Sequence, residues 1–220
     1  SGFHLHPDER MIIMTSQNLS PTNLNPKFFA YGSFPLYLLK FVSSLFSYDS
    51  YQLMPFVGRP ISALADTIVV ILIYKICLSL FKSSKTALIS AFIYAISVLP
   101  VQLSHFYAVD TLLNLFVWLT LSSLIFLKQK PSFKQVILTC LCFSLAVTTK
   151  ISAIILVLPF FLVFVSQLRS HLKLYLIAPL AILFFCFIFE PYAFLDFDTF
   201  IRQIKEQQAM TKDAFVFPYT

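Results

Sequence analysis

The residues best suited to chemistry stand near the start of the chain, in the tetrad His6-Pro7-Asp8-Glu9. Two adjacent carboxylates lie here on a polar stretch, ahead of a long series of segments rich in Phe, Leu and Ile. Charged groups that meet the edge of a bilayer mark a functional site more often than a packing site. A carboxylate in such a place can accept the proton of a hydroxyl group as a general base. The alternative is that both are ordinary loop charges.

Further charged residues lie at or near the ends of apolar segments. Asp110 opens one such segment, Lys150 separates two of them, and Glu190 and Asp196 follow the last. A charge at such a depth costs several kcal/mol unless it is paired or hydrated. One aqueous cavity at a membrane face would satisfy these groups together, so we expect Asp8, Asp110 and Lys150 to line it. The alternatives are that Asp110 only caps its helix and that Lys150 only reaches toward the interface.

This set of residues suits the transfer of a sugar from a lipid-phosphate carrier. A lysine near the headgroup level can neutralise the charge that develops on a departing phosphate. The lipid tail of the donor would stay in the bilayer, and the acceptor would come from the aqueous side. The 26 Phe and 10 Tyr residues fit a groove for a polyprenyl chain, although packing against lipid explains most of them.

The composition indicates a membrane protein, because 58% of the residues are hydrophobic and only 12% are charged. The 3 Gly residues argue against glycine-rich phosphate loops. The cysteines all fall in apolar runs, so we expect neither a disulfide framework nor a zinc site (Cys77, Cys140, Cys142, Cys186). His4, His6 and Asp8 alternate as metal ligands sometimes do. We assign no metal site to them and no certain cofactor to the protein, and a divalent metal stays an open alternative.

The distribution of charge predicts the topology. Six apolar runs, most close to the ~20 residues that span a bilayer, lie at about 61–81, 86–104, 110–127, 134–149, 151–168 and 172–189. Basic residues gather in three alternate loops that contain no Asp or Glu (Lys82 and Lys85; Lys128, Lys130 and Lys134; Arg169 and Lys173). Basic loops stay in the cytoplasm. This placement also accounts for the net charge of +6 without nucleic acid as a partner.

The sequence therefore predicts an all-α, polytopic bundle of six transmembrane helices. Residues 1–58 form an external loop, and residues 190–220 begin a later one. Within the first loop, the aromatic stretch 26–48 is broken by Gly32 and Pro35, which predicts short interfacial helices. The alternative, a spanning helix at 28–46, would reverse the orientation. Because the chain opens on Ser1 and directly on the candidate site, we expect it to be part of a longer protein with a preceding helix.

Four segments together resemble the GT-C superfamily of glycosyltransferases, and within it the dolichyl-phosphate-mannose protein mannosyltransferase-like family of bacteria and archaea. The matches follow the order of that family along the chain. The first is the family's first loop, with His6-Pro7-Asp8-Glu9 and residues 25–37 (NPKFFAYGSFPLY), and the others are residues 104–111 (SHFYAVDT), Thr149-Lys150 and residues 190–197 (EPYAFLDF). No single segment is decisive, but the four are fairly specific in combination.

The resemblance implies a function and assigns roles. It implies that Asp8 is the catalytic base with Glu9 in support, and that the remaining site residues bind substrate (Asp110, Lys150, His105, Arg59). It implies a polyprenyl-phosphate-linked sugar as donor, a protein, lipid or glycan as acceptor, and membrane lipids as surroundings. The protein is then expected in a prokaryotic plasma membrane, as a multi-pass protein with its active site on the external face.

One position departs from the resemblance. The related aminoarabinose transferases carry a basic residue before the Pro-Leu-Tyr stretch, where this chain has Ser33. Lys27 is the alternative cation for the phosphate, and the nature of the donor headgroup stays open.

Two other classes of protein compete with the transferase. A transporter or lipid flippase would use Asp66, Asp110 and Lys150 along a substrate path. The alternative for Asp66 is a simple pair with Arg59, seven residues earlier on the same helix face. Transporters usually place polar groups at the middle of the membrane and contain internal repeats. Here the charges cluster toward one face and no repeat is found. A membrane scaffold without activity is the third hypothesis.

Overall fold

The computed structural model describes residues 6–212, apart from the side chains of 168–171, 173, 174, 211 and 212. Within this part of the chain, helices account for the regular structure, and one isolated bridge pairs Ser20 with Asn23. The predicted all-α membrane architecture is confirmed.

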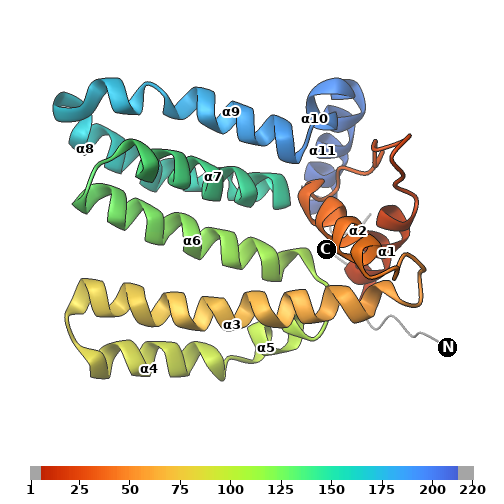
Figure 1. The fold of residues 1–220 in the computed structure, drawn as a ribbon, viewed down its shortest axis with the longest axis horizontal. Coiled ribbons are helices and arrows are strands. Elements are labelled where there is room, and N and C mark those ends of the chain that lie inside the picture. The colour runs from red at the N-terminus through yellow and green to blue at the C-terminus, as the bar shows by residue number, and fades with distance from the viewer. Residues whose placement is uncertain (1–5, 213–220) are drawn as a thin grey trace.

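The body of the molecule is a bundle of helices whose long axes run side by side (Figure 1). Each of the six predicted apolar runs corresponds to one of these helices or to a bent pair. In chain order they are α3 (Met54–Phe81), α4 (Ser84–Ala95), α5 (Val98–Ser104), α6 (Val109–Gln129), α7 (Phe133–Thr149), the 3-10 helix η1 (Ile151–Leu156), α8 (Val157–Tyr175) and α9 (Ala178–Phe189).

Two helices of the described part, α3 and α6, are long and apolar enough to cross a membrane. The pair α4 and α5, bent by 58° at their junction, makes a third if it counts as one span. The later helices α7 and α9 are apolar but shorter, with 17 and 12 residues. The prediction of six spans therefore stays a prediction.

Two predicted boundaries were wrong. Helix α3 begins at Met54, about two turns before the predicted run, so Arg59 and Pro60 lie inside it. Helix α8 continues to Tyr175, through the residues predicted as the third basic loop, and α9 begins only at Ala178. A proline lies in the first turn of both α3 and α9. Proline is favourable there because the N–H groups of the first turn have no partner within the helix, so the missing N–H breaks no hydrogen bond.

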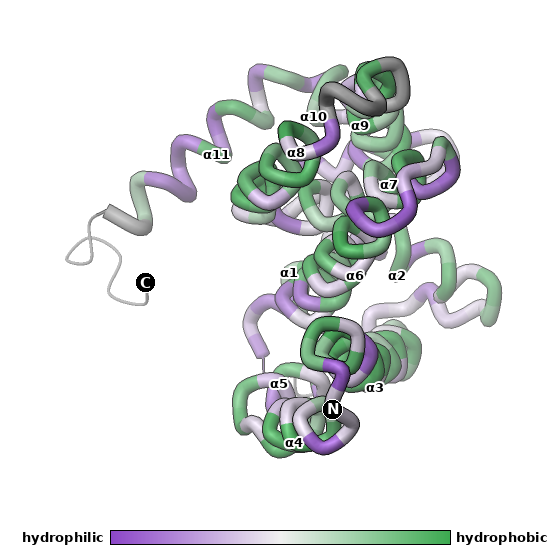
Figure 2. The backbone as a smooth tube through the Cα atoms, turned by 90° about the vertical axis from the view of Figure 1, so that its left-hand side faces the viewer, coloured by the Kyte–Doolittle hydropathy of each residue, from purple (hydrophilic) through white to green (hydrophobic). Residues whose placement is uncertain are grey.

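The two ends of the bundle differ. The turns α3–α4, α6–α7 and α8–α9 lie at one end (Figure 1). The opposite end carries the remaining helices, α1 (Pro7–Gln17), α2 (Phe34–Leu45), α10 (Tyr192–Leu195) and α11 (Phe197–Lys212). Helix α11 projects from the bundle and alternates polar with apolar residues (Figure 2). This grouping agrees with the charge pattern, and we refer to the second end as the site end.

The segment predicted as the first external loop contains the short helices that the sequence predicts. Helix α2 has only 12 residues, too few for the ~20 that span a bilayer, and residues 24–29 before it are not helical. Helix α1 was not expected. Its Pro7 occupies the first turn together with Asp8 and Glu9, and negative side chains are favourable at a helix N-terminus. Both carboxylates are thus fixed on a helix rather than on a mobile loop.

Buried aliphatic side chains hold these outer helices against the bundle. Ile12 and Ile13 of α1, Leu36 and Leu39 of α2, and Val69 of α3 are completely buried and belong to one cluster. Many large apolar side chains elsewhere on the bundle, such as Phe92 and Leu162, stay exposed. Exposed apolar faces of this kind are expected where lipid covers them.

Candidate active site

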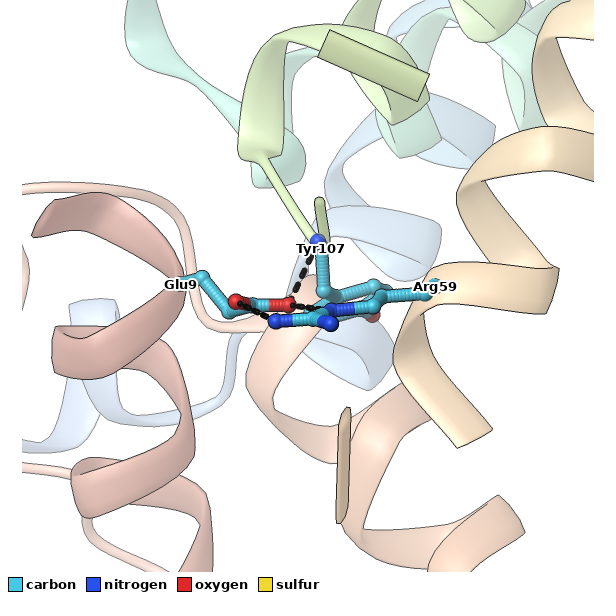
Figure 3. Close-up of polar contacts among 3 residues, drawn as sticks. All are labelled: Glu9, Arg59 and Tyr107. Carbon is cyan, nitrogen blue, oxygen red and sulfur yellow. Dashed lines mark hydrogen bonds and ion pairs between the residues drawn. The ribbon is translucent and has the colours of Figure 1, made fainter. Parts of the chain in front are cut away.

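A buried ion pair connects α1 to α3 (Figure 3). The Glu9 carboxylate is completely buried, and Arg59 donates to both of its oxygens, from Nε to Oε1 and from Nη2 to Oε2, at 2.9 Å each. The backbone N–H of Tyr107 also donates to Oε1, at 3.2 Å. Paired hydrogen bonds from a guanidinium fix direction as well as distance. Glu9 therefore fixes the start of α1 to α3 and to the turn before α6.

The alternative pair of Arg59 with Asp66 is not formed. Asp66 instead accepts a hydrogen bond from the Tyr94 hydroxyl, to which Asn114 donates in turn at 2.6 Å. Seven residues place Arg59 and Asp66 on one helix face, but two turns separate them by about 10.5 Å along the axis. Each side chain has a nearer partner on another helix.

Asp8 points toward the extended segment that precedes α2. The Tyr31 hydroxyl donates to Asp8 Oδ1 at 2.6 Å, and both side chains are half-buried. Burial raises the pKa of Tyr31 most, and the hydrogen bond and charge of Asp8 and the charge of Asp110 raise it further. The phenol therefore keeps its proton and acts as a hydrogen-bond donor.

Asp110 and Lys150 form the second ion pair of the site end. Lys150 Nζ lies 2.8 Å from Asp110 Oδ1, and the two side chains are 33% and 38% exposed. Asp110 sits in the first turn of α6, whose N-cap is Ala108, and Lys150 directly follows α7. The pair is thus partly exposed, and Asp110 does not serve as the N-cap.

Gly32 joins the Asp8 side of the site to the Lys150 side. Its N–H donates to the Thr149 carbonyl oxygen at 3.0 Å, and a Cβ at this position would lie 1.8 Å from the Thr148 carbonyl oxygen. Only glycine allows the backbone to approach α7 so closely. Gly32 directly follows Tyr31, which bonds Asp8, and Thr149 directly precedes Lys150. The backbone contact between Gly32 and Thr149 therefore ties the two parts of the site together.

The other residues considered for binding have partners outside the Asp110–Lys150 pair. His105 is exposed, and its Nδ1 lies 2.6 Å from the Val101 carbonyl oxygen of α5. His6 packs against Phe106 with ring centroids 5.5 Å apart, and Arg59 lies over the same ring. His4 lies outside the described residues. Within residues 6–212, no group of three His, Cys, Asp or Glu side chains is placed to hold a metal ion.

Ser33, the departure from the resemblance, contacts a carboxyl group. Its N–H and its hydroxyl donate to Glu190 Oε1 at 3.0 and 3.3 Å. Glu190 is only 6% exposed, and this burial raises its pKa to about 8, against the smaller opposing effect of the two donors. A buried carboxyl, rather than a phosphate, is thus the partner of this position.

The raised pKa of Glu190 predicts a pH-dependent stability. The folded state favours the protonated carboxyl, so its contribution is fully present below the ordinary value of 4.5 and is lost as the pH rises through about 8. Glu190→Gln keeps the shape and removes the titration. We expect the thermal unfolding midpoint of the wild type to fall relative to that of Glu190→Gln between about pH 5 and 9. Parallel pH profiles of the two midpoints would contradict this.

Reasoning from the sequence missed the residues that hold the segment before α2. Gln203 of α11 accepts from the Phe29 N–H at 2.6 Å and donates to the Lys27 carbonyl oxygen at 3.0 Å. Asn25 donates to Asp196 at 2.8 Å. Lys27, the alternative cation for the phosphate, is exposed on this segment. An asparagine ahead of an aromatic segment and a glutamine in a polar helix give no signal of such a role, because each partner lies about 170 residues away.

Helices of this composition with a polar site at one end define an integral membrane protein with a candidate site for transfer chemistry. The family model described as dolichyl-phosphate-mannose-protein mannosyltransferase matches residues 33–194, well over half of the chain, and the chain belongs to this family. Membership implies a membrane glycosyltransferase. The matched range includes Asp110 and Lys150 and begins after Asp8 and Glu9. Comparisons with curated proteins and with solved structures give no significant match.

Proposed function

We propose that the protein transfers a sugar from a polyprenyl-phosphate donor to a hydroxyl of a protein, lipid or glycan, on the external face of a prokaryotic plasma membrane. The family uses polyprenyl-phosphate-linked donors, and its description points to mannose as the sugar. The observation that carries the proposal is the Lys150–Asp110 pair at the same bundle end as Asp8, which accepts a hydrogen bond from Tyr31.

In the proposed reaction, Asp8 accepts the proton of the acceptor hydroxyl as that oxygen attacks the anomeric carbon of the sugar. The new glycosidic bond forms while the bond from the anomeric carbon to the phosphate oxygen breaks. The electron pair of the broken bond leaves with the polyprenyl phosphate. Attack from the side opposite the leaving group inverts the anomeric centre.

Lys150 is the proposed cation for the leaving phosphate. Its side chain is one-third exposed, and the proposal is that an incoming phosphate reaches the ammonium group there. Asp110 holds the ammonium group in place before the donor binds. A positioned cation stabilises the charge that develops on the phosphate in the transition state. Ser33 is engaged with Glu190, so the basic contact of the aminoarabinose transferases has no counterpart at that position.

Glu9 and Arg59 support this chemistry by position. Both Glu9 oxygens accept hydrogen bonds from Arg59 in a buried setting, which suits a holding role better than proton transfer. Since Glu9 is the neighbour of Asp8 on α1, fixing Glu9 also fixes the helix that carries the base.

The transporter hypothesis receives less support. Asp66, which it needs along a path, accepts a hydrogen bond from Tyr94 between helices. Lys150 and Asp110 neutralise each other at one end of the bundle and not at its middle.

The function is tested with radiolabelled mannosyl polyprenyl phosphate and membranes that contain the full-length protein. We expect transfer of the label by the wild type and a loss of at least about 100-fold in Lys150→Met, the magnitude typical for one group that stabilises transition-state charge. Lys134→Met, an exposed lysine at the other end of α7, is the matched control and should keep the wild-type rate. No transfer by the wild type, or equal rates in both variants, would contradict the proposal.

A further inference from the structure

We propose that Tyr31 is a positioning residue for Asp8: its hydroxyl occupies one oxygen of the carboxylate and leaves the other directed at the acceptor. This inference rests on the proposed function, in which Asp8 is the general base. It adds a residue to which neither the charge pattern nor the family match gives a role.

The geometry around Asp8 carries the inference. Tyr31 donates to Asp8 Oδ1 at 2.6 Å, within the range of strong hydrogen bonds to a carboxylate. In the described part of the chain, no hydrogen-bond donor is found for Asp8 Oδ2. A carboxylate held by one oxygen cannot rotate freely, so its second oxygen keeps a fixed direction.

Tyr31 is itself held from both sides along the chain. After it, the Gly32 N–H is bonded to the Thr149 carbonyl oxygen. Before it, the Gln203 amide bonds the backbone of Lys27 and Phe29. The ring also packs edge-on against Phe28, with centroids 5.6 Å apart. The backbone that carries Tyr31 is therefore held by contacts with α7 and α11, in addition to the bond with Asp8.

The charges that face the phenol keep it a donor. Asp8 from α1 and Asp110 from α6 both raise the pKa of Tyr31, in addition to burial. Lys150 neutralises Asp110 at 2.8 Å. The same phenol therefore bonds the proposed base, and the charge of Asp110, which belongs to the pair proposed to meet the phosphate, helps to keep it protonated. The hydrogen bond between Tyr31 and Asp8 should therefore affect the rate of the reaction step and not the affinity for the lipid donor.

The test separates positioning from packing by removing only the hydroxyl. Tyr31→Phe keeps the ring and its contact with Phe28. The matched control is Tyr37→Phe, because Tyr37 is another half-buried tyrosine, and its hydroxyl donates to the Leu24 carbonyl oxygen at 3.0 Å. Full-length protein in membranes is assayed with labelled mannosyl polyprenyl phosphate, and kcat and the donor KM are determined for each variant.

We expect Tyr31→Phe to lower kcat by about 10-fold or more, with the donor KM within about twofold of the wild type, because only an interaction of the reaction step is lost. Tyr37→Phe should change neither value. In an Asp8→Asn background, Tyr31→Phe should cause no further loss, since residues that act as one unit are not additive.

Three results would overturn the inference. A wild-type kcat in Tyr31→Phe, together with a slow Asp8→Asn, would remove the role of Tyr31 and leave the proposed function intact. An equal further loss in the Asp8→Asn background would show that Tyr31 acts independently of Asp8. A wild-type rate in Asp8→Asn alone would instead remove the general base, and this inference with it.

Discussion

Arg59→Met is expected to lower the free energy of unfolding by about 3 kcal/mol, the largest stability effect of a single substitution at the site. Removing one partner of a buried ion pair typically costs about 3–5 kcal/mol, because the other charge is left uncompensated. Glu9 is completely buried here, whereas the Arg59 side chain is 39% exposed, which places the effect at the lower end. Denaturant unfolding of the purified protein in detergent measures it.

The Lys150–Asp110 pair supplies the control for Arg59→Met. Its side chains are 33% and 38% exposed, and solvated pairs contribute about 0–1 kcal/mol. Lys150→Met should therefore cost less than about 1 kcal/mol of stability while abolishing most of the transfer. The double variant Glu9→Gln with Arg59→Met removes both charges and should recover part of the loss. Wild-type stability in Arg59→Met would show that the ion pair does not hold α1.

Gly32→Ala is expected to reduce sugar transfer by about 100-fold, the size of effect that a displacement of about 1 Å can have on a reacting geometry. The added Cβ would lie 1.8 Å from the Thr148 carbonyl oxygen, so the segment before α2 must move away from α7. That movement breaks the bond from the Gly32 N–H to Thr149 and displaces Tyr31 from Asp8. The initial rate of transfer in membranes measures the effect.

The size of the new side chain provides the control for Gly32→Ala. Because the clash arises at the first carbon, Gly32→Ser should lose about as much activity as Gly32→Ala. A wild-type rate in Gly32→Ala would mean that the contact with α7 does not fix the site.

The helices of the bundle could be predicted because apolar runs of membrane length have few alternatives to a helix. Their ends were harder to place. Arginine and proline are common in loops, so Arg59 and Pro60 suggest that the helix has not yet begun. Helix α3 nevertheless begins before them, with Pro55 in its first turn, and continues through both residues. Helix α1 escaped prediction because it is short and carries no long apolar run, and its stability comes from packing Ile12 and Ile13.

The charged residues of the site could be selected from the sequence, but their partners could not. Asp8, Asp110 and Lys150 stand out because charges beside apolar runs are costly. The partner of Glu9 is 50 residues away, and that of Ser33 is 157 residues away. Such pairings depend on how whole helices are placed side by side. The periodicity of a single helix suggested Arg59 with Asp66, and the arrangement of several helices decided otherwise.

The most direct test of the account is the initial rate of sugar transfer by full-length Asp8→Asn in membranes, with labelled mannosyl polyprenyl phosphate as donor. The amide keeps the shape of Asp8 and its contact with Tyr31 but cannot accept the proton. If Asp8 is the general base, kcat should fall by about 10²–10⁴-fold, the usual contribution of such a group, and the donor KM should not change. Glu206→Gln, an exposed carboxylate on α11, should keep the wild-type rate. Equal transfer by Asp8→Asn and the wild type would contradict the account.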